Sequence, residues 1–155
     1  MLIAFLFAAS IALPSARPVR ALDVIVNTDD LRSQSDSAMK KVGKGDLEGA
    51  LQDLSRSWPL PASELEAMIE QTRLQLPGMK ERFGEVLGYE FIREDIVGTS
   101  FVRRTYIQRF ERHATRWIIT YYRNASGWVV NSVTFDDNLI GLFEREHQPS
   151  IKPER

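Results

Sequence analysis

Three consecutive β-prone runs between Phe101 and Phe135 constrain this chain more than any other feature of its sequence. The runs are rich in Val, Ile, Thr, Tyr, Phe and Trp, and short breaks at 111–114 and 124–127 separate them. Breaks of this length are typical of hairpin connections between antiparallel strands. The pattern therefore predicts an antiparallel meander onto which the preceding part of the chain folds.

Two helices are predicted at the start of this preceding part. The first would be capped by Asp29 or Asp30 and would end at Gly43, and the second would be capped by Asp46. Apolar and small residues recur in both segments at the spacing of a helix face. The predicted faces are Leu31, Ser35, Ala38, Met39 and Val42 in the first helix and Leu47, Ala50, Leu51 and Leu54 in the second.

A third helix and one further strand complete the predicted elements. Ser63 and Glu66 have the spacing of a capping box, and Pro77-Gly78 is expected to break the helix. Its apolar side would consist of Leu65, Met68, Ile69, Thr72 and Leu76. The segment 84–97 is predicted to be a strand, bent at Gly88, that leads into the meander.

Three helices followed by about four antiparallel strands indicate an α+β fold, with a curved sheet and one domain over residues 22–143. Both alternating sets of the meander carry large apolar residues. Phe101 and Ile107 belong to one set, and Val102, Tyr106 and Phe110 belong to the other. We therefore expect the helices to cover one face of the sheet, and a partner or the sheet's own curl to cover the other.

The apolar segment Met1–Leu13 predicts a signal peptide over residues 1–21. It is shorter than the roughly 20 residues that span a bilayer. Cleavage after Ala21 and cleavage after Ala16 are both compatible with the sequence, and an uncleaved anchor or a buried helix is the alternative to cleavage. We expect a periplasmic or secreted protein without stable membrane insertion after cleavage. The tail 144–155 is expected to be disordered.

The composition narrows the functional classes. The 155 residues include no Cys, so disulfides and thiolate metal sites are excluded. Removal of residues 1–21 takes away Arg17 and Arg20 and no acidic residue, which changes the formal charge from −1 to −3. An acidic mature chain does not favour a nucleic-acid partner.

The chain resembles the NTF2-like, cystatin-like α+β superfamily. The resemblance rests on the helical first half ending in LPGMKERFG, on the strand GYEFIREDIVG, and on the pattern from Arg103 through Tyr106, Trp117 and Gly127-Trp128 to Phe135. It covers about 29–143 and implies a cone-shaped shell of sheet and helices. Members of this superfamily include isomerases, dehydratases, transport adaptors and inert dimers, so the resemblance implies a fold and no particular activity.

Arginine is the most prominent polar residue of the meander. Six arginines lie close together, and they are Arg103, Arg104, Arg109, Arg112, Arg116 and Arg123. Cross-strand ion pairs with acids of the preceding strand are one interpretation, and an anion-binding concavity is the other. Arg104 and Tyr106 share one face, and Gln108 extends the same row. We predict that Arg104, Tyr106 and Tyr122 bind a ligand inside the cone.

The remaining polar residues give weaker signals. His113 lies in a predicted hairpin and His147 in the tail, and neither has the spacing of a metal site. Asp136 and Asp137 follow the last strand, where turn formation is the favoured interpretation. We predict neither a metal nor a cofactor.

The sequence thus favours a non-catalytic domain that binds a small anionic or apolar ligand or a protein, and that forms a homodimer through the outer face of the sheet. A small isomerase-like or hydrolyase-like enzyme, with an Asp base and Tyr106 as hydrogen-bond donor, is one alternative. A structural subunit of an envelope complex is another.

Overall fold

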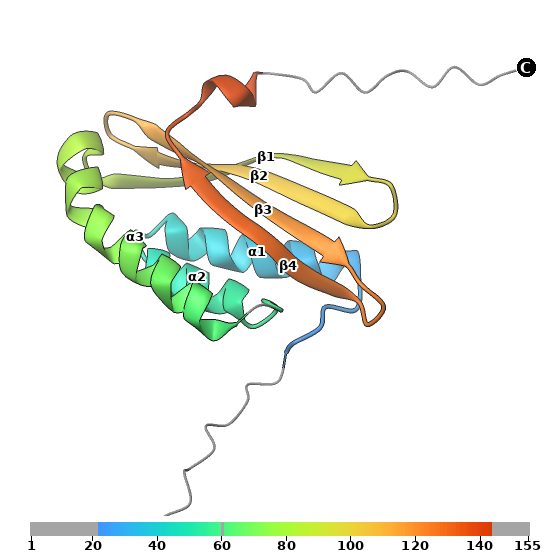
Figure 1. The fold of residues 1–155 in the computed structure, drawn as a ribbon. Coiled ribbons are helices and arrows are strands. Elements are labelled where there is room, and N and C mark those ends of the chain that lie inside the picture. Colours follow the sequence, from blue (N-terminus) through green and yellow to red (C-terminus); the bar gives the residue numbers. More distant parts are fainter. Residues whose placement is uncertain (1–21, 60, 144–155) are drawn as a thin grey trace, which may run out of the picture.

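An antiparallel sheet of four strands forms one layer of the protein, and three helices lie against one of its faces (Figure 1). The structure is a computed structural model that describes residues 22–59 and 61–143. The expected signal peptide and tail lie outside these residues. The elements are α1 Thr28–Val42, α2 Leu47–Ser55, α3 Ala62–Phe83, β1 Val86–Val97, β2 Phe101–Phe110, β3 Ala114–Arg123, β4 Trp128–Asp136 and the 3-10 turn η1 Ile140–Leu142.

The sheet is the predicted meander, with strand order β1-β2-β3-β4. Its connections have local causes. The amide of Phe110 donates to the carbonyl of His113 across the β2–β3 turn. The side chain of Asn124 accepts from the amides of Ser126 and Gly127 in the β3–β4 turn. The α+β class and the helix-then-strand order predicted from the sequence are confirmed.

Gly88 bends β1 as the sequence suggested. The register with β2 shifts between Val86 and Gly88, and the φ angle of Gly88 is 136°, which strains residues that carry a Cβ. A second shift lies between Phe91 and Arg93. Such irregularities twist an edge strand and make its pairing with other chains less favourable.

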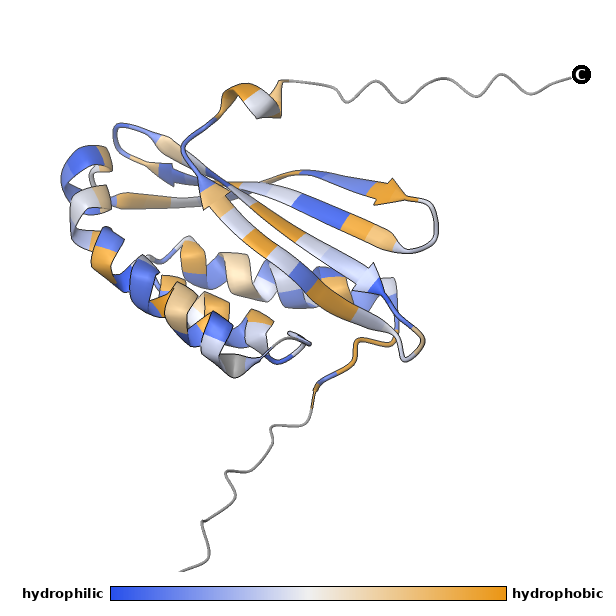
Figure 2. Ribbon diagram, in the orientation of Figure 1, coloured by the Kyte–Doolittle hydropathy of each residue, from blue (hydrophilic) through white to orange (hydrophobic). Residues whose placement is uncertain are grey.

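The inner face of the sheet and two helices form the hydrophobic core. The side chains of Tyr106, Trp117 and Tyr121 are completely buried beneath α1 and α2, and Trp117 stacks on Phe135 with a centroid distance of 4.6 Å. Figure 2 shows hydrophobic residues along the strands and along the helices that lie beneath them. The set of Val102, Tyr106 and Phe110 therefore faces the helices.

Helices α1 and α2 bury the predicted faces. Every residue predicted for these two faces is buried. Asp46 caps α2 as expected, because its carboxylate accepts from the amide of Gly49. The cap of α1 differs from the prediction. Asn27 accepts from the amide of Asp30, so Asp29 and Asp30 lie in the first turn, where their charges favour the helix N-terminus.

The predictions for the ends of α3 were wrong. Its N-cap is Pro61, without a side-chain capping bond, and the helix continues through Pro77 to Phe83. A proline within a helix loses one backbone hydrogen bond. Here both sides of Pro77 are anchored. Thr72 is buried on one side, and Phe83 packs on Phe110 and His113 on the other, at 5.5 and 4.8 Å between ring centroids.

The outer face of the sheet is partly covered by η1. Arg93 donates to the carbonyl of Leu142 at 3.1 Å, and a side chain at position 141 would meet the guanidinium of Arg116. Thr105, in the middle of the sheet, is only 2% exposed. Phe101 and Tyr122, further along this face, stay partly exposed.

The segment that leads into α1 is fastened to β4. Ile25 and Trp128 exchange backbone hydrogen bonds of 3.0 and 2.8 Å. Gly127 packs so closely on this segment that a Cβ would lie 2.7 Å from the carbonyl oxygen of Ile25. In the described part of the chain, no helix is long and apolar enough to cross a membrane.

We predict that Gly78→Ala raises the free energy of unfolding by about 0.5–1 kcal/mol, because Ala favours a helix interior and a Cβ at this position meets nothing within 4 Å. Urea denaturation measures the change. Gly88→Ala is the contrasting variant and should destabilise, since its φ angle is positive. A loss of stability in Gly78→Ala would mean that α3 is broken there.

Candidate functional site

A cleft of about 330 Å³ opens between α3 and one end of the sheet. Its walls come from the α1–α2 turn, the C-terminal half of α3, the start of β1 and the end of β2. We call it the α3 cleft. Its lining residues are Lys44, Gly45, Leu47, Leu76, Met79, Lys80, Gly84, Glu85, Val86, Gln108 and Phe110.

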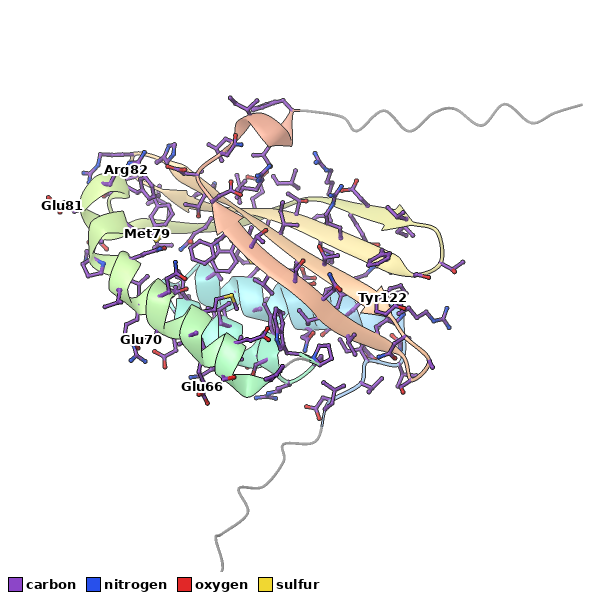
Figure 3. The ribbon with its side chains drawn as sticks, in the orientation of Figure 1. Glu66, Glu70, Met79, Glu81, Arg82 and Tyr122 are labelled. Carbon is purple, nitrogen blue, oxygen red and sulfur yellow. The ribbon has the colours of Figure 1, made fainter. Side chains whose placement is uncertain are left out.

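Apolar and polar side chains share the lining of the α3 cleft. Leu47 and Phe110 are almost fully buried and belong to the inner faces of α2 and β2. Leu76 and Met79 are partly buried on α3, and Met79 lies near its C-terminal end (Figure 3). An apolar lining with few polar groups is typical of small-molecule sites.

Gln108 forms the polar part of the inner wall. Its side-chain amide donates to the carbonyl of Val42 at 2.9 Å. Its carbonyl oxygen accepts from Thr115 at 3.4 Å and from Trp117 at 3.3 Å. Gln108 is completely buried, and these three bonds hold it in one orientation. The residue therefore gives the cleft a fixed wall.

The charged groups lie at the rim of the cleft. Lys80 and Glu85 form an ion pair of 2.9 Å, and both side chains are more than half exposed. The hydrogen bond that Lys80 donates to Glu85 raises the pKa of Lys80. Lys44 is exposed and forms no ion pair within residues 22–59 and 61–143. The rim thus carries two cations, Lys80 with a carboxylate partner and Lys44 without one in the described part of the chain.

Two of the predicted ligand residues lie together outside the α3 cleft, against helix α1. Arg104 and Tyr106 point from β2 toward α1 and join a polar cluster that we call the α1 clamp. It consists of Arg32, Ser35, Asp36, Glu94, Arg104 and Tyr106. The hydroxyl of Tyr106 lies 2.8 Å from Asp36 Oδ1 and 3.0 Å from Ser35 Oγ. Burial raises the pKa of Tyr106, so this hydroxyl stays protonated.

Arg104 is bound by groups of the protein itself. Its Nη1 donates to the carbonyl of Arg32 at 2.8 Å, to Ser35 Oγ at 2.6 Å and to Asp36 Oδ1 at 3.0 Å. Its Nε lies 3.3 Å from Glu94 Oε2, and the guanidinium lies over the ring of Phe91. Arg104 is 6% exposed. The arrangement fastens α1 to β1 and β2.

Tyr122 lies on the opposite face of the sheet from Arg104 and Tyr106. Its ring packs on Phe101 at 5.1 Å, and the residue is 39% exposed. The structure therefore does not bring the three predicted residues to one cavity. Gln108, which the alternation placed in the row of Arg104 and Tyr106, does share their face and reaches the α3 cleft.

The other arginines of the meander mostly meet acids or carbonyls. Arg103 lies 3.5 Å from Asp95, and Arg116 pairs with Asp136 at 2.9 Å on the outer face. Arg112 donates to two carbonyls at the end of α3. These contacts match the ion-pairing interpretation more closely than the anion-binding one.

The remaining candidate residues do not converge. His113 packs on Phe83, and His147 lies outside the described residues. Among the described residues, no group of three or more His, Asp or Glu side chains could hold a metal ion. Asp137 pairs with Arg82. The enzyme alternative needs a carboxylate in the cleft, and the acid that lines it is Glu85, which is exposed and paired with Lys80.

Comparison with protein-family models, curated proteins and solved structures gave no match.

We predict that Glu94→Gln lowers the free energy of unfolding at pH 7 by about 1–2 kcal/mol. The hydrogen bond from Arg32 lowers the pKa of Glu94, whose side chain is 16% exposed. A lowered pKa stabilises the fold above the ordinary value of about 4.3, and this contribution is lost as the pH falls through the lowered value.

The difference between the two proteins should therefore shrink between about pH 5 and pH 3. Urea denaturation at several pH values measures it. Glu90→Gln, at an exposed position of the same strand, is the control and should change stability little at either pH. An equal loss at pH 7 and pH 3 would contradict a role for the Glu94 charge.

Proposed function

We propose that this protein is a non-catalytic domain that binds a small molecule in the α3 cleft. The observation that supports the proposal is the cleft itself, with about 330 Å³ of open space against a partly apolar lining. Pockets for small molecules begin at about this size. Most of its polar groups are bound within the protein, since Gln108 has three hydrogen bonds and Glu85 is paired with Lys80.

We further propose that the domain is NTF2-like and acts in the periplasm or outside the cell. The order of three helices before a four-stranded antiparallel sheet supports the first part. The apolar segment Met1–Leu13 and the absence of Cys from the sequence support the second part.

Methionine methyl groups give a direct test of ligand binding in the α3 cleft. In protein labelled with ¹³C at the methionine methyls, small apolar and amphipathic compounds should shift the signal of Met79, which lines the cleft. The signal of Met39, which is completely buried in the core, should stay in place. A panel in which no compound shifts Met79, or in which both signals move equally, would refute the site.

Two variants of α3 make the test specific. Leu76→Trp should fill the cleft and abolish the shift of Met79, because Leu76 lines it. Leu74→Trp is the matched control. Leu74 lies two residues away on the same helix and is 74% exposed, so this variant should bind as the wild type does. Equal binding by both variants would place the ligand elsewhere.

A homodimer through the outer face of the sheet is a second proposal. Val97, Phe101 and Tyr122 are neighbours across three strands and are 61%, 38% and 39% exposed. We call them the outer apolar patch. A patch on a regular sheet can pair with its own copy about a twofold axis.

We predict that Tyr122→Glu shifts this dimer toward the monomer, because the charge would be buried against an apolar surface. Sedimentation velocity over a range of protein concentrations measures the shift. Leu74 is exposed on α3, away from the sheet, so Leu74→Glu should leave the association unchanged. A wild-type protein that stays monomeric at every concentration would rule out the dimer.

A further inference from the structure

We propose that the ligand of the α3 cleft is an amphipathic monoanion, a carboxylate on a short apolar chain whose charged end binds Lys44. This inference rests on the proposed function, because it names the ligand class of the same cleft. It depends on three properties of the cleft, which are its charge, its lining and its size.

The charge of the rim favours an anion. Lys80 is neutralised by Glu85 at 2.9 Å, whereas Lys44 has no ion pair in the described part of the chain. Lys44 is not needed to balance the partial negative charge at the C-terminal end of α1. Lys40 and Lys41 already occupy the last turn of that helix, and Lys41 pairs with Asp53 at 2.7 Å. The ammonium group of Lys44 is therefore available to a ligand.

The same groups limit the ligand to one negative charge. A phosphate or dicarboxylate is usually held by an Arg fork or by several cations. The described lining of the cleft contains no Arg, and Lys44 is its one cation without a carboxylate partner. A single unpaired ammonium group fits a monovalent head group.

The inner part of the cleft requires an apolar body. Leu47, Leu76, Val86 and Phe110 line it together with Met79. Met79 carries an unbranched, flexible side chain, and methionine adapts to apolar ligands of different shape. The side-chain amide of Gln108 is already hydrogen-bonded within the protein. An apolar ligand chain beside it therefore displaces no water molecule on which this amide depends for a hydrogen bond.

The volume sets the length of the chain. A cleft of about 330 Å³ holds roughly ten non-hydrogen atoms, at about 30 Å³ for each group the size of a water molecule. Octanoate has this size. Longer chains would extend from the open mouth into solvent and gain little.

The test compares three probes that share one chain, namely octanoate, octanol and octylammonium. Titration of ¹³C-methyl-labelled protein at low ionic strength gives each Kd from the shift of Met79. Octanoate should bind about twofold to fivefold more tightly than octanol, which is the range of an exposed ion pair. Octylammonium should bind most weakly, and added salt should reduce the preference for octanoate.

Variants assign the preference to one side chain. Lys44→Ala should abolish the advantage of octanoate over octanol and leave octanol binding unchanged. Lys40→Ala is the matched control, because Lys40 is exposed and lies outside the cleft. Both variants change exposed side chains, and an unchanged Met39 signal would show that the fold is intact.

The outcomes separate the two proposals. If octanol and octanoate shift Met79 with equal affinity, or if Lys44→Ala keeps the preference, the cleft binds ligands but the anion inference is wrong. If none of the three probes shifts Met79, both the inference and the proposed site are overturned.

Discussion

A buried guanidinium is the constraint on which the helical layer depends. A charge taken out of water is tolerated only when other groups bind and compensate it. Arg104 meets this condition through α1, which supplies a carbonyl, the hydroxyl of Ser35 and the carboxylate of Asp36, and through Glu94 of β1. The helix therefore cannot slide along the sheet without leaving a buried charge unpaired. The hydroxyl of Tyr106 donates to Asp36 as well and so stabilises the same position of α1 on the sheet.

The α3 cleft arises because α3 follows a different path from α1. It packs on α2 and rejoins the sheet at its end, where Phe83 meets Phe110. Between these two anchors the α3 cleft stays open toward the α1–α2 turn and the start of β1. Glu66 and Glu70 project from the exposed side of α3 (Figure 3). The helix thus presents one face to the cleft and a charged face to water.

The sequence predicted those parts of the fold in which a local rule is not overridden by distant contacts. The strands of the meander and the buried faces of α1 and α2 follow from the periodicity of the sequence. The bend of β1 at Gly88 follows from the conformational freedom of glycine. The expected break at Pro77 failed because tertiary anchors on both sides outweigh one lost hydrogen bond. Alternation placed Arg104, Tyr106 and Gln108 on one face correctly, but it gives no information about the helix that covers this face.

The cleft residues were missed for the same reason. Lys44, Met79 and Glu85 come from separate segments and share no spacing, so only the path of the chain brings them together. Their one sequence signal is that they lie near ends or interruptions of helices, where loops often carry function.

The backbone pairing of Ile25 with Trp128 also determines where the chain enters the domain. This entry point lies beside the β3–β4 turn, whereas the α3 cleft opens at the other end of the sheet (Figure 1). A protein or surface attached ahead of Leu22 would therefore be held at the far end of the molecule. Immobilisation through this end would leave the mouth of the cleft facing solution.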